Sequence, residues 1–268
     1  MNGYVELGYL DLVAAAAFLV LDGLISLRLR LGIERQLAWS AARMVVQLLL
    51  VGLVLEAVFA VASPWLTLAI ALLMVGFAGR EVRARQARRL EGPWGLGLGI
   101  GAMLLGGSLV TTVALTSLIE PTPWWTPRYA LPLFGMILGN AMTGVSLGLD
   151  TLHSRLYRER AAVEARLPLG HDRRSALAPL VRESLRSGFM PIVNAMSVTG
   201  IVALPGMMTG QILSGVAPRE AVKYQLAIMF LIGGATGLGV VGAVLGSAWR
   251  LTDARHRLRL DRLRASAR

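Results

Sequence analysis

Long apolar blocks separated by short polar segments form the main pattern of the chain. Several of these blocks approach the ~20 residues that an α-helix needs to cross the hydrocarbon core of a bilayer. The pattern therefore predicts an all-α, polytopic integral membrane protein with about seven transmembrane helices. The predicted spans are Leu7–Leu27, Leu37–Val61, Pro64–Gly79, Trp94–Leu118, Tyr129–Leu149, Phe189–Leu213 and Val222–Trp249.

Composition supports the membrane assignment. The chain has 268 residues, of which 55% are hydrophobic and 16% charged, whereas a soluble domain has about a quarter charged residues. Cysteine is absent, so the sequence holds neither a disulfide framework nor a thiolate metal site. We treat residues 1–268 as one transmembrane domain.

The basic residues show which way the spans run. They gather after the first span, after the third, between residues 151 and 188, and in a basic tail over residues 250–268. Only Arg128, Arg219 and Lys223 lie on the other side of the predicted bilayer. Because basic loops stay in the cytoplasm, the N-terminus is expected outside and the C-terminus inside. Confinement of this charge to loops between apolar blocks argues against nucleic acid as a partner.

The segment 151–188 is too long for a simple turn and shows helical periodicity on both sides of Pro168 and Gly170. Either Asp172 or Ser175 can cap the second helix. We expect a cytoplasmic helical hairpin between the fifth and sixth spans that leads directly into the sixth. It acts either as a lever on that span or as a solvated basic loop. The apolar positions that recur are Leu152, Leu156, Val163, Leu167, Leu177, Leu180, Val181 and Leu185.

A few polar side chains fall inside the predicted spans, where each needs a reason. Asp22 and Arg43 lie at similar predicted depths, and we expect a structural ion pair between them, joined by Gln47. Asn140 and Asn194 sit in similar stretches, Asn-Ala-Met followed by Thr-Gly. They either hydrogen-bond across helices or line a translocation pathway.

The stretch 203–215, ALPGMMTGQILSG, is predicted as the outer half of the sixth span. Pro205 lacks a backbone N–H and should kink or break the helix, while Gly206 and Gly210 begin a small-residue stripe suited to close helix contact. Met207 and Gln211 form the neighbouring stripe, and together with Met208 they are candidates that face either the pathway or another helix.

Nucleotide and metal sites are missing from the sequence. A P-loop requires Gly-Lys-Ser/Thr, but the single lysine, Lys223, stands between Val222 and Tyr224. Any ATP-driven activity would therefore require a separate ATPase. Histidine and carboxylate residues show no metal-ligand spacing, and no nucleophile and base converge, so we expect neither a bound metal nor an enzyme.

Residues 163–170, VEARLPLG, place Glu164, Ala165 and Gly170 at the spacing of the coupling loop of ABC importer permeases, with Arg166 where alanine is usual. Three longer stretches and the hairpin resemble the FetB family of ABC transporter permeases, whose plant members are linked to aluminium tolerance. These stretches are ARMVVQLLLVGLVLEAVF (42–59), LPLFGMILGNAMTGVSLGLDTL (131–152) and VALPGMMTGQILSGVAPREAVKYQLAIMF (202–230).

The resemblance implies a permease subunit in a bacterial cytoplasmic (inner) membrane, which works with a separate FetA-like ATP-binding subunit to export a metal ion, iron in the bacterial members. It also implies two permease copies, with ATP and Mg bound by the partner ATPase and no cofactor on this chain. An ion-gradient-driven secondary transporter is the alternative. The residues expected to contact the ATPase are Glu164, Ala165, Gly170, Arg182 and Glu183.

Overall fold

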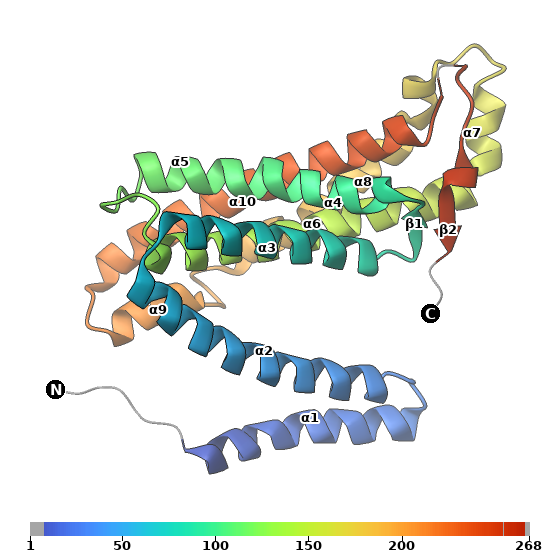
Figure 1. Ribbon diagram of the computed structural model, residues 1–268. Helices are drawn as coiled ribbons and strands as arrows, with labels where there is room; N and C mark the ends of the chain where they lie inside the picture. Colours follow the sequence, from blue (N-terminus) through green and yellow to red (C-terminus); the bar gives the residue numbers. More distant parts are fainter. Residues whose placement is uncertain (1–7, 254, 266–268) are drawn as a thin grey trace.

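The computed structural model describes residues 8–253 and 255–265 and shows an almost entirely helical protein (Figure 1). Leu7, the predicted start of the first span, and residues 254 and 266–268 of the basic tail lie outside this part. Within it, six helical stretches are long and apolar enough to cross a membrane. They are α1 (Tyr9–Leu29), α2 (Glu34–Val61), α3 (Pro64–Ala84), the composite of α4 (Pro93–Met103), η1 (Leu104–Ser108) and α5 (Leu109–Ser117), α6 (Pro127–Arg158) and α10 (Pro218–Arg250).

The predicted sixth span, Phe189–Leu213, is not a continuous helix. α8 (Arg173–Val198) starts in the hairpin and ends at Val198, and α9 (Gly206–Leu213) is a separate short helix. Between them, the N–H of Gly200 donates to the carbonyl of Ala203 at 2.9 Å. Pro205 has extended backbone angles and precedes α9, because proline offers no N–H to a preceding helical turn. The chain is therefore interrupted over several residues before Pro205 rather than bent at one point.

α6, α8 and α10 form the centre of the bundle and meet at small residues. Gly144 of α6 faces Gly188 of α8, and Val240 of α10 packs against both. A Cβ added to Gly144 would lie 2.6 Å from the carbonyl oxygen of Gly188, so the two backbones approach too closely for any side chain. Close approach of this kind drives helix association in lipid, where there is no hydrophobic force between helices.

α1 and α2 form a hairpin that stands away from the bundle in Figure 1. The two helices are joined at the turn, where the Ser26 hydroxyl donates to Glu34 at 2.8 Å. The predicted ion pair between Asp22 and Arg43 is wrong for this structure: both side chains and Gln47 are exposed, and neither charged group pairs with a described residue. Ser26 lies level with Glu34, Asp22 is four residues from Ser26 along α1, and Arg43 is nine residues from Glu34 along α2. At 1.5 Å per residue, Arg43 therefore lies roughly 7 Å farther from the turn than Asp22 and cannot face it.

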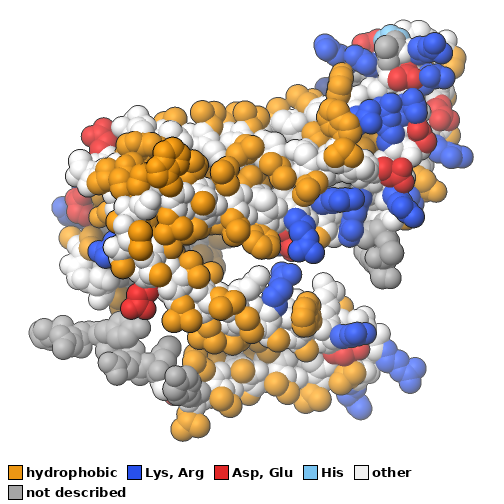
Figure 2. Space-filling model, viewed as in Figure 1, with side chains coloured by type: hydrophobic (Ala, Val, Ile, Leu, Met, Phe, Trp, Pro, Cys, Tyr) orange, Lys and Arg blue, Asp and Glu red, His pale blue; other side chains and the backbone are white. Residues whose placement is uncertain are grey.

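One end of the molecule carries most of the arginines (Figure 2); we call it the basic end. It contains the end of α6, α7 (Arg160–Arg166), the start of α8 and the C-terminal segment. α6 has 32 residues and is about 48 Å long at 1.5 Å per residue, so it extends well beyond a ~30 Å hydrocarbon core. The membrane helices therefore continue into this end without a break.

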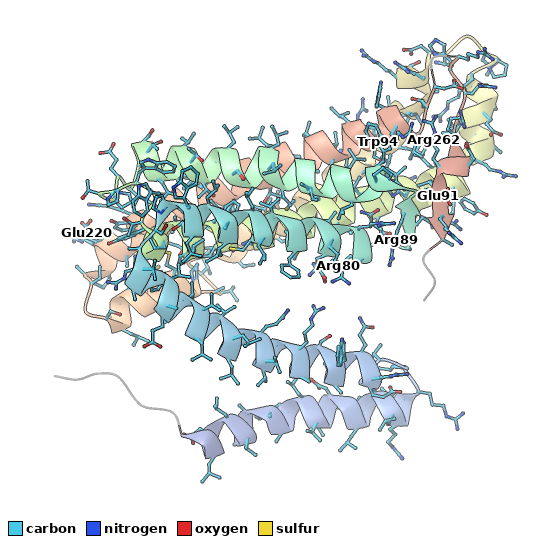
Figure 3. The ribbon with its side chains drawn as sticks, in the orientation of Figure 1. Arg80, Arg89, Glu91, Trp94, Glu220 and Arg262 are labelled. Atoms are coloured by element: carbon cyan, nitrogen blue, oxygen red, sulfur yellow. The ribbon has the colours of Figure 1, made fainter. Side chains whose placement is uncertain are left out.

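The basic tail is folded back onto the bundle. β2 (Leu263–Ala265), which follows the short turn η2 (Leu260–Arg262), pairs antiparallel with β1 (Arg88–Leu90) from the loop after α3. Figure 3 shows Glu91 and Arg262 at this end and Glu220 at the opposite end. The backbone N–H of Glu91 donates to the carbonyl of Arg262 at 2.8 Å. The tail thus closes the basic end instead of extending into solvent.

His153 ties three of these elements together. Its Nδ1 lies 3.0 Å from the carbonyl oxygen of Arg88 and its Nε2 lies 2.7 Å from the hydroxyl of Ser247. The ring is 1% exposed, so both polar atoms are satisfied inside the protein. α6, β1 and α10 are therefore held in register at the basic end.

The close contact between α6 and α8 at Gly144 leads to a prediction about stability. We expect Gly144→Ala to lower the thermal unfolding midpoint of the purified chain, because overpacking costs roughly 1–3 kcal/mol. Gly139→Ala in the same helix is the control, since its added Cβ meets nothing within 4 Å. Unfolding followed by tryptophan fluorescence measures both variants, and equal midpoints would contradict the close contact.

Candidate functional site

The side of α6 and α8 that faces away from α10 is not covered by any described helix, and it carries Asn140 and Asn194. Both side chains are exposed. Gly144 faces Gly188, and α6 and α8 are antiparallel, so Asn140, four residues before Gly144, lies level with Ile192, four residues after Gly188. Asn194 is only about 3 Å from Ile192 along the axis of α8. The structure therefore brings the two asparagines to the same depth on the same face.

Hydroxyl side chains three residues further on extend this feature. Thr143 and Ser197 are also exposed, and each follows an asparagine by the same spacing. Asn140 donates to a backbone carbonyl one turn earlier in its own helix at 2.8 Å, Thr143 does so at 3.1 Å and Ser197 at 2.8 Å. Their oxygen atoms remain available as acceptors on the exposed side. We call Asn140, Thr143, Asn194 and Ser197 the polar strip.

Thr143 and Ser197 were not among the residues predicted to line a pathway. The signal was present in the sequence, because Asn-Ala-Met-Thr at 140–143 matches Asn-Ala-Met-Ser at 194–197. Residues three apart lie on the same side of a helix. Only the antiparallel packing of α6 against α8 shows that the two copies share one face.

α9 turns one of its predicted stripes toward the bundle. Met207 packs against the apolar cluster around Ile137, Ile192 and Ile228, so it contacts neighbouring helices. Met208 and Gln211 are half-buried, and Oε1 of Gln211 is buried without a hydrogen-bond partner.

The predicted small-residue stripe of α9 faces outward. Gly206 and Gly210 are exposed, and a Cβ at either would meet nothing within 4 Å. In this chain the stripe therefore makes no close helix contact, contrary to the sequence interpretation, because the break before Pro205 separates α9 from the line of α8.

The tip of the hairpin presents the coupling-loop motif to solvent. Glu164, Ala165 and Gly170 are all exposed, while Val163 beside them is 1% exposed and anchors α7 to the core. Gly170 has φ +89°, a conformation that side-chain-bearing residues rarely adopt. The motif therefore sits on a fixed base with its polar side outward.

α8 begins directly after this tip, and Asp172 rather than Ser175 is its N-cap. The Asp172 carboxylate accepts a hydrogen bond from the N–H of Ser175 at 3.0 Å. Hydrogen bonds from the hydroxyl and the N–H of Ser175 hold the pKa of Asp172 below its ordinary value, so the cap is charged at neutral pH.

Arg182 and Glu183 lie elsewhere. They are about three turns along α8 from its start, so the structure does not bring them to the tip with Glu164 and Gly170. Glu183 forms an ion pair with Arg155 of α6, which also bonds Glu159 at 2.7 Å. Arg182 lines a groove between α8 and α10.

Over the described residues, no group of three or more histidine or carboxylate side chains is arranged to hold a metal ion. The polar strip offers neutral oxygen atoms only. It can therefore contact a passing polar or cationic solute, but its geometry is not that of a resident metal centre.

Comparison with known proteins places the chain in a family. A family model described as an uncharacterised protein family, UPF0014, matches residues 9–251. A UPF0014 membrane protein of Synechocystis is 38% identical over 203 residues, which is 75% of this chain and 77% of that protein. The probable iron export permease protein FetB of Escherichia coli is 31% identical over 257 residues, 95% of this chain and 96% of that protein.

A third relative comes from a plant: the UPF0014 membrane protein STAR2 of rice is 35% identical over 255 residues, covering 92% of this chain and 87% of that protein. No solved structure was found to match the chain. The match of the family model to nearly the whole described length, together with these relatives, shows that the chain belongs to the UPF0014 family of multi-pass membrane proteins, which includes a protein named as a probable iron export permease.

Proposed function

We propose that this protein is the membrane-spanning permease subunit of an ABC transporter that exports a metal cation, with iron as the leading candidate. The observation that carries the proposal is membership of the family that contains FetB, combined with a solvent-exposed coupling-loop motif at the tip of the hairpin. FetB is named as a probable iron export permease.

The energy source belongs to a second protein in this proposal. The 268 residues contain no Gly-Lys-Ser/Thr sequence, so the chain has no P-loop of its own. A FetA-like ATPase subunit would bind ATP and Mg and dock on the exposed face of Glu164, Ala165 and Gly170. Under the positive-inside rule this basic end would lie in the cytoplasm. Bacterial relatives support the proposal that the chain lies in a bacterial inner membrane.

The polar strip is the proposed contact surface for the cation. Oxygen ligands are the ones that hard cations prefer, and the strip supplies amide and hydroxyl oxygens in place of part of the hydration shell. Its four side chains are exposed, so no described helix of the same chain covers it. A second copy of the permease would face it and enclose the pathway, so we propose a homodimer carrying two ATPase subunits.

The hairpin is well placed to transmit motion. Leu149, Leu152 and Leu156 run along α6 from the bundle into the hairpin as part of one apolar cluster, which Val163 of α7 and Leu177 of α8 join. Tightly packed interiors transmit displacement rather than absorb it. A shift of the tip on ATP binding would therefore move α6 and α8, which carry the polar strip.

The energy source separates this proposal from a gradient-driven transporter. In vesicles that contain the chain and its ATPase partner, we expect cation efflux to stop when ATP is removed and to persist when an uncoupler collapses the proton gradient. Efflux with the opposite dependence would support a secondary transporter instead. ATP hydrolysis by the purified chain alone would also contradict the assignment.

The tip gives a docking prediction. We expect Gly170→Leu to lower co-purification of the ATPase about tenfold, because disrupting a central interface position costs roughly 1–2 kcal/mol or more.

Gly215→Leu is the matched control for Gly170→Leu. It has φ +91°, is exposed, meets nothing within 4 Å and lies at the other end of the molecule. The two variants should be equally folded by size-exclusion chromatography, and equal loss of the ATPase from both would refute docking at the tip.

The polar strip gives a transport prediction. Asn140→Leu and Asn194→Leu should each reduce efflux several-fold without changing protein yield, because each removes an oxygen ligand from the exposed side. Leu109→Ala is the control, since Leu109 is exposed on α5 and is not part of the polar strip. Normal efflux by both asparagine variants would remove the strip from the pathway.

A further inference from the structure

An open groove of about 690 Å³ runs between α8 and α10 at the basic end. Apolar side chains line it along its length, among them Val181 and Leu185 of α8 and Leu245 of α10. Leu245 is 50% exposed, so the apolar wall is open to its surroundings. The groove therefore has a place for an apolar chain that no part of the described protein fills.

Basic side chains line the same groove. Arg173, Arg174 and Arg182 line it, and no acidic residue does so among those described. Arg174 and Arg182 are exposed and form no ion pair with any described residue. Arg173 is held by the tail, where its guanidinium donates to the carbonyl of Asp253 at 3.4 Å. Two arginines are thus available for an anion beside the apolar wall.

The groove crosses the level at which a membrane surface is expected. Gly188 of α8 contacts Val240 of α10, and the two helices are antiparallel. Arg182, six residues before Gly188, therefore lies level with Gly246 and about 9 Å closer to the basic end than Gly188. Trp249, one turn beyond Gly246, lines the same groove and is 57% exposed. Exposed tryptophan at a helix end is typical of the bilayer interface.

We propose that this groove binds one anionic phospholipid from the leaflet on the basic side. Its phosphate would lie between Arg174 and Arg182, and one acyl chain would cover Val181, Leu185 and Leu245. Basic pockets between membrane helices on the cytoplasmic side bind lipid headgroups in this way. The groove begins at the first turn of α8, next to the hairpin tip, but it shares no residue with the coupling-loop motif or with the polar strip. The inference therefore does not rest on the transported substrate.

The combination of features favours a lipid over a free anion. A soluble phosphate would satisfy the arginines but leave the exposed Leu245 and Trp249 uncovered. A zwitterionic lipid would cover the apolar wall but bring no net negative charge to arginines that have no partner among the described residues. An anionic phospholipid satisfies both parts at once.

The test measures lipid retained by the full chain. The protein is exchanged into micelles containing equal parts of phosphatidylglycerol and phosphatidylcholine, and bound lipid is measured by native mass spectrometry. We expect phosphatidylglycerol to be retained preferentially. Arg174→Gln and Arg182→Gln should each lower its retention about fivefold, since a basic residue near anionic lipid contributes roughly 1 kcal/mol.

Two matched variants sharpen the result. Arg160→Gln removes one exposed arginine from α7 at the same end but outside the groove, and it should retain lipid normally. Ala178→Phe narrows the groove without changing charge, because Ala178 lines it, and it should lower retention of phosphatidylglycerol. Tryptophan fluorescence during heating checks that all variants remain folded.

Other outcomes would overturn the proposal. Equal retention of phosphatidylcholine would show a crevice that any lipid fills, and equal loss from Arg160→Gln would show a general surface charge effect. Displacement of the lipid by glycerol phosphate alone would assign the arginines to a soluble phosphate. A change in oligomeric state by Ala178→Phe with unchanged lipid retention would assign the groove to a second copy of the chain.

Discussion

At Gly144 and Gly188 the backbones of α6 and α8 come closer than any side chain would allow, and Val240 of α10 packs against both glycines. In a bilayer the lipid tails are as apolar as leucine, so helices gain little from burying apolar surface against each other. Dispersion contacts at short range must hold them, and those contacts need small residues. The positions of the polar strip, the hairpin and the groove all follow from how these three helices cross.

The same three helices connect the membrane to the basic end. α6 extends past the expected bilayer, and its apolar side continues from Leu149 through Leu156 into the hairpin. The tail, through β2, and His153, between Arg88 and Ser247, hold this end closed. A partner that pushed on Gly170 would therefore move a packed body. This rigidity is what the proposed coupling to an ATPase requires.

The uncovered parts of the structure are equally informative. α1 and α2 expose most of their apolar residues, and the polar strip has no described helix over it. An exposed apolar surface is stable in contact with lipid, whereas an exposed row of amide and hydroxyl oxygens is not. The two surfaces therefore suit different occupants: lipid on α1 and α2, and the proposed second subunit and cation along the strip.

Hydrophobic block length and charge asymmetry determined, from the sequence alone, that the chain is a helical, multi-pass membrane protein, and the stretches around Asn140 and Pro205 indicated its family. These features are local, because length, charge and motif spacing act within one segment. Only the tertiary structure decided that Asn140 and Asn194 share a face, that Asp22 and Arg43 do not pair, and that the tail folds back. The first outcome depends on the register of α6 against α8, which the close contact at Gly144 and Gly188 sets. The second depends on the register of α1 against α2 at the hydrogen bond from Ser26 to Glu34, and the third on the pairing of β2 with β1. No periodicity within a single helix encodes any of these contacts between segments.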